Sequence, residues 1–201
     1  FVFHFTYVKE FLGKELNAIS FLTTLNKAIY EINSMCFYIT VYPSVFPGYE
    51  SSLPENFMKL IAPSLYPDYI PYFNLTSDFI SQHSTAAGKY MSEITSKMVK
   101  LDNDNEYVQG VSDILTKIEL DNGLTVKATL NQMLIDSKSV LLYTDPLTYY
   151  ESKEYIRLGS DYMLLFSAFS DMSTMATTYA STISRKSNDL LNNLMILSIS
   201  N

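Results

Sequence analysis

Cysteine is almost absent from this chain, because Cys36 is the only one in 201 residues. A single cysteine excludes an intrachain disulfide framework and any multi-cysteine metal site. It lies in the apolar run 32–42, where a free cysteine behaves as a small buried hydrophobe. The alternatives to burial are an intermolecular disulfide and a reactive thiol.

Histidine is equally scarce, with His4 and His83 as the two examples. A multi-histidine metal site and a paired-histidine mechanism therefore lack their residues. His83 lies in the polar helical stretch 81–85, and it is expected at the surface.

Glycine is also scarce, with six residues, so the chain has little material for the backbone loops that cradle phosphates. The sequence contains no GxSxG, CxxC or HExxH motif, which removes the usual signatures of nucleophilic and metal catalysis. The sequence therefore predicts that this protein is not an enzyme. It also predicts no cofactor and no catalytic or metal-ligating residue.

The nearest match to a metal motif is the acidic turn 102–106, with Asp113 at the twelfth place of a calcium-loop register. Such a loop needs glycine at its sixth place and usually glutamate at its twelfth. Here those places hold Tyr107 and Asp113. The turn is therefore predicted to be solvated and to cap a helix.

Charge is low, at 17% of the residues, and 21 acidic against 14 basic side chains give a net charge of −7. The basic residues occur singly or in pairs, whereas binding to a phosphate backbone requires clustered lysine and arginine. A nucleic-acid partner is therefore excluded. The same sign of charge disfavours electrostatic docking on anionic lipid.

What the chain has in quantity is apolar side chains at helical spacing. Hydrophobic residues make up 47% of it, including 16 tyrosines and 12 phenylalanines. The pattern predicts an all-α, multi-helix bundle in a single domain, 1–201, with long helices at about 7–42, 74–101 and 148–197 and shorter helices between them. The apolar stripe of the first helix is Val8, Leu12, Leu16, Ile19, Leu22, Leu25, Ile29, Ile32, Cys36 and Ile39.

Proline is confined almost entirely to 43–71, which contains six of the seven prolines, interleaved with aromatic residues. Flexible linkers are rich in glycine and serine and poor in aromatics. The segment 43–72 is therefore predicted to be an ordered excursion packed against the bundle, rather than a separate domain. The alternative is a proline–aromatic surface that contacts a partner.

Residues 118–126 allow two interpretations. The turn Asp121-Asn122-Gly123 can separate two helices. Alternatively, the alternating residues on either side of it can pair as a tight β-hairpin. The helical spacing that follows, up to Leu142, favours the helix–turn–helix.

The last fifty residues carry the strongest helical pattern. Apolar residues recur at steps of three and four from Tyr155 to Leu197, the spacing of a coiled-coil seam. We expect Leu165, Phe169, Met172 and Ile183 to be buried. A constitutive transmembrane helix is disfavoured, because Asp171 falls in the middle of the least charged window.

The opposite face of this helix carries small hydroxyl side chains in place of lysine and glutamate. Such residues allow helices to approach closely, so we predict that this face packs against another helix. That helix is either a long antiparallel neighbour within the bundle, or belongs to a protein partner or to another copy of the chain. The candidate interface residues are Ser160, Ser167, Ser170, Ser173, Thr174, Thr177 and Ser181.

Tyrosine and methionine are abundant in the same region and could line a cavity for an apolar ligand. Packing in the core is the commoner role for such residues. The candidate lining residues are Tyr143, Tyr149, Tyr150, Tyr155, Tyr162, Tyr179, Met163, Met172 and Met175.

The triplet Asn74-Leu75-Thr76 is an N-glycosylation acceptor, and the chain begins with Phe1 rather than methionine. With the scarcity of cysteine, these features favour an extracellular or secretory protein. The function predicted from sequence is that of a secreted, acidic glycoprotein, a helical bundle that acts through protein–protein interaction or self-assembly. The alternative is a carrier of a hydrophobic ligand or a helical protein that engages membranes.

Overall fold

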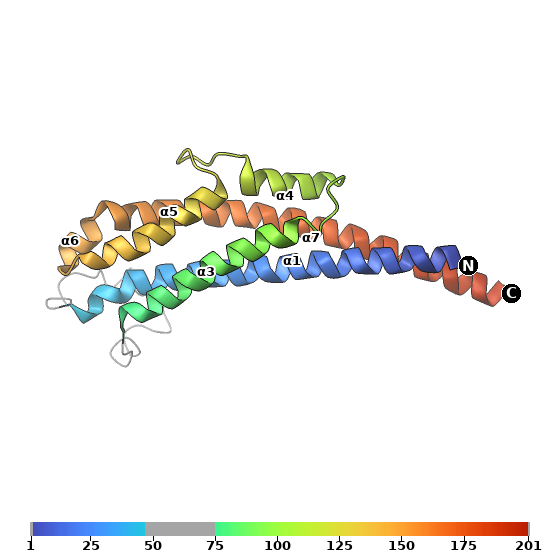
Figure 1. The fold of residues 1–201 in the computed structure, drawn as a ribbon, viewed down its shortest axis with the longest axis horizontal. Helices are drawn as coiled ribbons and strands as arrows, with labels where there is room; N and C mark the ends of the chain where they lie inside the picture. Colours follow the sequence, from blue (N-terminus) through green and yellow to red (C-terminus); the bar gives the residue numbers. More distant parts are fainter. Residues whose placement is uncertain (1, 47–74, 201) are drawn as a thin grey trace. The chain divides into compact units, whose positions relative to one another are not determined.

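The computed structural model describes residues 2–46 and 75–200, whose helices are drawn in Figure 1. Helices account for 86% of these residues, and none of them is in a β-strand. In chain order the elements are α1 (Val2–Val41), the 3-10 turn η1 (Tyr42–Val45), α3 (Ser77–Met98), α4 (Glu106–Thr116), α5 (Val126–Ser139), the 3-10 turn η4 (Val140–Leu142), α6 (Pro146–Glu151) and α7 (Lys153–Ser200). The predicted all-α bundle is confirmed, with α1, α3 and α7 as its three long helices.

None of the helices in the described segments is both long and apolar enough to cross a bilayer. Asn74 and residues 47–72 of the proline-rich segment lie outside the described residues. The predictions of glycosylation and of an ordered excursion therefore remain predictions.

Helix α7 begins at Lys153 rather than at 148, because Ser152 interrupts the helix. The backbone of Ser152 is extended, with φ −64° and ψ 147°. Its hydroxyl accepts a hydrogen bond from the Tyr155 N–H at 3.1 Å and donates one to the Tyr149 carbonyl at 2.7 Å. A serine that accepts the N–H three residues later is an N-cap. The short helix α6 therefore ends where α7 begins.

The acidic turn before α4 caps that helix, as predicted. The side-chain oxygen of Asn105 accepts from the backbone N–H groups of Tyr107 and Val108, at 2.9 and 3.4 Å. This bond satisfies donors that the first turn of a helix leaves unpaired.

The connection 117–125 joins two helices without forming strands. α4 ends at Thr116 and α5 begins at Val126. Between them, the Leu120 N–H donates to the Leu124 carbonyl at 2.8 Å, and Gly123 takes a φ of +77°. Glycine adopts this left-handed conformation at no steric cost, so the Asp-Asn-Gly turn folds back on itself between two helices.

The contacts of the chain divide it into two compact units. Unit 1 comprises the segments Phe1–Lys27, Tyr90–Lys127 and Phe166–Asn201, and unit 2 comprises Ala28–Lys89 and Ala128–Leu165. The single domain predicted from the sequence stays a prediction.

In unit 2, α1 packs against α3, and α3 packs against α5. His83 of α3 pairs with Glu31 of α1 and stacks on Tyr38, with ring centroids 5.4 Å apart. The hydroxyls of Ser84 and Ser137 are 3.4 Å apart, which joins α3 to α5. His83 is thus half-buried and engaged on two sides, in contrast to the surface position expected from the sequence.

The remaining two contacts close unit 2 into an antiparallel four-helix bundle. Arg157 of α7 pairs with Asp136 of α5. Tyr162 of α7 donates to Asn33 of α1 at 2.8 Å, and further along both helices Tyr155 interacts with Thr40. Since residue numbers rise along α7 as they fall along α1, the two helices run in opposite directions, as in up-and-down bundles.

In unit 1 the packing is mostly apolar. Helix α4 lies close to α7, because a side chain at Gly110 would come within 2.8 Å of the Met175 sulfur. Lys97 of α3 reaches back to α1, where its ammonium group donates to Thr24 Oγ1 at 2.5 Å. The buried apolar side chains of unit 1 include Phe21, Leu25, Met91, Ile94, Val108, Val111, Leu115, Phe169, Met172, Tyr179 and Ile183.

The predicted burial along α7 is confirmed at Leu165, Phe169, Met172 and Ile183. Buried and half-buried positions recur along α7 about every 3.6 residues, the period of an undistorted α-helix. Beyond Ile183 the buried positions are Ser187 and Leu194, which continue this period. A stripe with the 3.5-residue spacing of a coiled coil would drift off the packed face of such a helix.

The apolar stripe predicted for the first helix is wrong in its early part. Leu12, Leu16 and Ile19 are 40%, 67% and 49% exposed. The packed face of this part of α1 carries Ala18 and Phe21 instead. From Leu25 onward the predicted stripe joins the packed face, which includes Ile32 and Ile39.

Candidate functional site

An apolar groove runs between α1 and α7 in unit 2. Its volume is about 560 Å³. Its lining residues are Asn33, Cys36, Phe37, Ile39 and Thr40 of α1, Tyr150 of α6, and Tyr155, Ile156, Leu158, Gly159, Ser160, Tyr162 and Met163 of α7. Aliphatic, aromatic and sulfur-containing side chains make up most of this set, which is typical of ligand pockets.

The end of the groove near α6 is fixed by tyrosine hydroxyls. Tyr149 is fully buried and donates to the Ile39 carbonyl at 2.7 Å, and Tyr150 donates to the Thr40 carbonyl at 2.6 Å. Both carbonyls belong to the last turn of α1, where a helix leaves its carbonyl groups without intrahelical partners. The tyrosines therefore satisfy that helix end and hold α6 against α1.

The Tyr149 ring also packs in an aromatic cluster. Its centroid lies 5.7 Å from that of Phe46, 5.4 Å from that of Tyr150 and 5.8 Å from that of Tyr155. These separations are typical of favourable edge-to-face and tilted pairs. The cluster gives this end of the groove a rigid aromatic wall.

The most exposed polar contact of the groove is between Tyr162 and Asn33. The tyrosine hydroxyl donates to the Asn33 side-chain oxygen at 2.8 Å. A carboxamide has two N–H donors in addition to its oxygen. Asn33 therefore brings a hydrogen-bond donor to a wall that is otherwise mostly apolar.

Cys36 lies in the wall contributed by α1. Burial raises the pKa of its thiol to about 12, so at neutral pH the thiol is protonated. A protonated thiol is a poor nucleophile. Burial likewise raises the pKa of Tyr155 and Tyr162, and the groove holds these groups in their neutral forms.

Gly159 contributes open space to the groove. A Cβ atom added there meets no other atom within 4 Å. On either side of it, Ile156 and Met163 are 61% and 65% exposed although both line the groove. The groove is therefore open to solvent between two large apolar side chains.

The face of α7 turned toward α5 carries a charged cluster. The Arg157 guanidinium binds Asp136 through two hydrogen bonds of 2.7 and 2.6 Å, and Asp136 is 1% exposed. This hydrogen-bonded pairing raises the pKa of Arg157. Glu154, which is also buried, accepts from the Tyr143 hydroxyl at 2.9 Å. With Asp161 buried one turn further on, three carboxyl groups surround one guanidinium.

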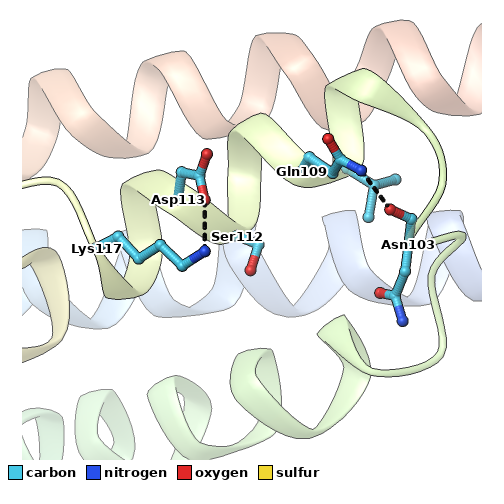
Figure 2. A pocket seen from close by; sticks show the side chains of 6 residues that line it. Asn103, Gln109, Ser112, Asp113 and Lys117 are labelled. Atoms are coloured by element: carbon cyan, nitrogen blue, oxygen red, sulfur yellow. Dashed lines mark hydrogen bonds and ion pairs between the residues drawn. The ribbon is translucent and has the colours of Figure 1, made fainter.

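Unit 1 has a smaller, polar cavity of about 340 Å³ beside α4 (Figure 2). Its walls carry an exposed ion pair between Lys117 and Asp113, 3.6 Å apart, and a 2.9 Å bond from the Gln109 side chain to the Asn103 carbonyl. Both pairs link residues of one short stretch of chain. The polar groups of this cavity therefore bond chiefly to one another.

The residues described by the structure contain no cluster of three or more acidic, histidine or cysteine side chains suited to a metal ion. In the acidic turn, Asp102 pairs instead with Lys14 at 3.3 Å. This arrangement agrees with the solvated, helix-capping turn predicted from the sequence.

The candidate interface residues of α7 lie at the surface of this chain. Ser173 is half-exposed and the other six are exposed. The Thr174 hydroxyl bonds to the Ser170 carbonyl at 3.0 Å, which is the local bond expected of a hydroxyl in a helix. Ser160 alone among them lines the groove. The partner that would cover this face stays a prediction.

The candidate cavity residues separate into three groups. Tyr150, Tyr155, Tyr162 and Met163 line the groove. Tyr143 and Tyr149 belong to unit 2 but do not line the groove, and Met172, Met175 and Tyr179 belong to unit 1. The wall of the groove that α1 contributes was not predicted, because the sequence does not show which residues of α1 face α7.

No protein-family model, curated protein or solved structure matches this chain.

Proposed function

We propose that this chain is a non-enzymatic binding protein whose site is the apolar groove between α1 and α7 of unit 2. The observation that carries the proposal is the groove itself. A volume of about 560 Å³ falls within the roughly 300–1,000 Å³ of small-molecule sites, which are likewise lined by apolar side chains with a few polar groups. The ligand is an apolar molecule that occupies the space beside Gly159.

The walls of the groove are preformed, which favours binding. Tyr149, Tyr150 and Tyr162 each tie the α6–α7 side to α1 through a hydrogen bond of 2.8 Å or less. A site that does not need to be ordered on binding loses less of its interaction energy to conformational entropy.

The chemistry of the lining favours binding over catalysis. Its titratable groups are Cys36 and tyrosines, and burial raises the pKa values of Cys36, Tyr155 and Tyr162. General acid–base catalysis works best with groups whose pKa lies near the operating pH. Groups held neutral, with tyrosine hydroxyls that bond to Thr40 and Asn33, are suited to shaping a site.

A second candidate function is binding to a protein partner or self-assembly through unit 1. The specific observation is the exposed stripe Leu12, Leu16 and Ile19 on α1, spaced four and three residues apart as in helix-pair seams. The secretory location and the glycan at Asn74 belong to the same proposal. Self-assembly through this stripe is excluded if the parent is a monomer in sedimentation equilibrium. It is also excluded if the parent is an oligomer whose mass Leu16→Glu leaves unchanged.

The groove can be tested by filling it. In Gly159→Met a side chain enters open space, and replacing a helical glycine adds about 0.5–1 kcal/mol to helix stability. Gly13→Met is the matched control, because a Cβ at Gly13 of α1 in unit 1 also meets nothing within 4 Å. Both variants should melt at or above the temperature of the parent.

The readout is the fluorescence of N-phenylnaphthylamine, an uncharged apolar dye, titrated into each protein. The parent and Gly13→Met should bind it alike, and Gly159→Met should bind at least tenfold more weakly. If the parent does not bind the dye, or Gly159→Met binds it as well as the parent, the groove is not the site.

A further inference from the structure

We propose that the groove selects an uncharged amphiphile, an apolar chain with a neutral oxygen headgroup, and discriminates against the carboxylate of the same chain length. This inference rests on the proposed binding function and adds the class of ligand. It follows from three features of unit 2: the uncharged lining, the carboxyl-rich cluster on the other side of α7, and the amide of Asn33.

The described lining residues carry no formal charge at neutral pH. A carboxylate that leaves water for an apolar site must be compensated by hydrogen bonds or by a cation, because an unpaired charge in such a place is strongly disfavoured. The lining that the structure describes offers a fatty acid no arginine or lysine to pair with its carboxylate. A neutral headgroup requires only a hydrogen bond.

The arginine closest in sequence to the lining is already engaged. Arg157 lies between two lining residues, Ile156 and Leu158, but its guanidinium donates two hydrogen bonds to the buried carboxylate of Asp136. Glu154 and Asp161, each next to a lining residue in sequence, add two further carboxyl groups. Because carboxyl groups outnumber the one guanidinium in this cluster, it disfavours an anion in the groove relative to a neutral ligand.

Asn33 supplies the bond that a neutral headgroup needs. Its side-chain oxygen is used by Tyr162, which leaves the N–H₂ group as a donor toward a hydroxyl or carbonyl oxygen. The neighbouring polar groups bond within the protein, since Thr40 Oγ1 donates to the Cys36 carbonyl at 2.9 Å and Tyr150 donates to the Thr40 carbonyl. The amide of Asn33 is therefore the recognition group for the ligand's oxygen.

The test compares decanol and decanoate, which differ only in the headgroup, by calorimetry at slightly alkaline pH and below the concentration at which either aggregates. Decanol should bind at least tenfold more tightly. The binding site is located through Cys36, the single thiol of the chain, whose reaction with methyl methanethiosulfonate should slow when decanol occupies the groove. Equal or tighter binding of decanoate would overturn the inference.

A charge-gain variant tests the same point from the opposite direction. Asn33→Lys places a cation at the exposed rim and should tighten decanoate binding at least tenfold while removing the preference for decanol. Asn131→Lys, on an exposed position of α5 in the same unit, is the control and should leave both affinities unchanged. Unchanged decanoate binding in Asn33→Lys would show that the headgroup does not lie at Asn33.

The outcomes distinguish a failure of this inference from a failure of the proposed binding function. If neither ligand gives heat or protects Cys36, the groove does not bind apolar ligands and the proposed function fails. If both ligands protect Cys36 equally, the groove binds but does not select by charge, and only the inference fails.

Discussion

Both units of this chain have an apolar core, but they supplement it with different polar contacts. In unit 2, where Ile32, Met133 and Leu158 are among the buried side chains, these contacts are directed hydrogen bonds, from tyrosine hydroxyls to the α1 carbonyls and from Arg157 to Asp136. In unit 1 they come from the flexible ammonium groups of Lys14 and Lys97. The two units also differ in how far side chains fill the space beside α7. Buried Phe169, Met172 and Tyr179 fill the packed face of α7 in unit 1, whereas Gly159 leaves the groove open in unit 2.

The largest expected effect is the loss of a core side chain in unit 1. Phe169 is 2% exposed, and Phe169→Ala should lower the free energy of unfolding by about 3–5 kcal/mol, through lost burial and the cavity left behind. Phe166→Ala is the control, because Phe166 is 51% exposed on the same helix. Urea unfolding of the two variants measures the difference. Similar losses in both would show that the apolar packing of unit 1 is not what the structure describes.

The next effect contrasts the ion pairs of the two units. Arg157→Met leaves the buried Asp136 carboxylate without its cation and should cost about 3 kcal/mol, at the low end for such pairs because the arginine side chain is 43% exposed. Lys14→Met breaks a pair whose side chains are 30% and 31% exposed, which should cost under about 1 kcal/mol. If chemical denaturation gave equal losses of unfolding free energy for Arg157→Met and Lys14→Met, the contrast between the ion pairs of the two units would be wrong.

A smaller effect appears at alkaline pH and belongs to unit 2. The ordinary pKa of a cysteine is 9.0 and burial raises that of Cys36 to about 12, so the folded state holds its proton more tightly than the unfolded state. The associated stability is intact below the unfolded pKa and is lost as pH rises between the two values. By about pH 10.5 this loss reaches about 2 kcal/mol.

Comparison with the variant Cys36→Ala separates the loss of stability caused by ionisation of Cys36 from that caused by ionisation of the tyrosines. Urea unfolding near neutral pH and at about pH 10.5 should show a decrease in stability that is about 2 kcal/mol smaller in Cys36→Ala than in the parent. An identical decrease in both proteins would mean that the thiol is not buried in the wall of the groove.

The smallest effect concerns the hydroxyl face of α7. Ser170 and Thr177 are exposed in the chain, so the double variant Ser170→Lys, Thr177→Lys should change the stability of an isolated chain by under about 0.5 kcal/mol for each substitution. A drop in molecular mass by light scattering, with the melting temperature of the dissociated chain preserved, would establish this face as an interface between chains. Loss of folding would contradict its exposure.

The sequence was sufficient to predict the helices and the buried face of α7 as far as Ile183, because apolar residues recur there at steps of three and four. The sequence was not sufficient to predict the buried face of the early part of α1. Leu12, Leu16 and Ile19 form one apolar face and Ala18 and Phe21 form part of another, and periodicity cannot decide which of two such faces meets a neighbour.

The groove was predictable only in part. The abundance of tyrosine and methionine pointed to Tyr150, Tyr155, Tyr162 and Met163. The opposing wall depends on the contact of Asn33 with a residue 129 positions away, and no local signal encodes that pairing. The role of Gly159 also requires knowledge of its surroundings, because a glycine in a helical pattern is otherwise only a weak point.

The most direct test of the binding groove uses methionine methyl groups as probes. Met163 lines the groove and is 65% exposed, while Met195 is 62% exposed in unit 1, so the two are matched for solvent access. With ¹³C-labelled methionine methyls, titration of N-phenylnaphthylamine should shift the Met163 resonance in a saturable way and leave that of Met195 in place. A dye that binds without moving Met163, or that moves both resonances equally, would contradict the assignment of the groove as the ligand site.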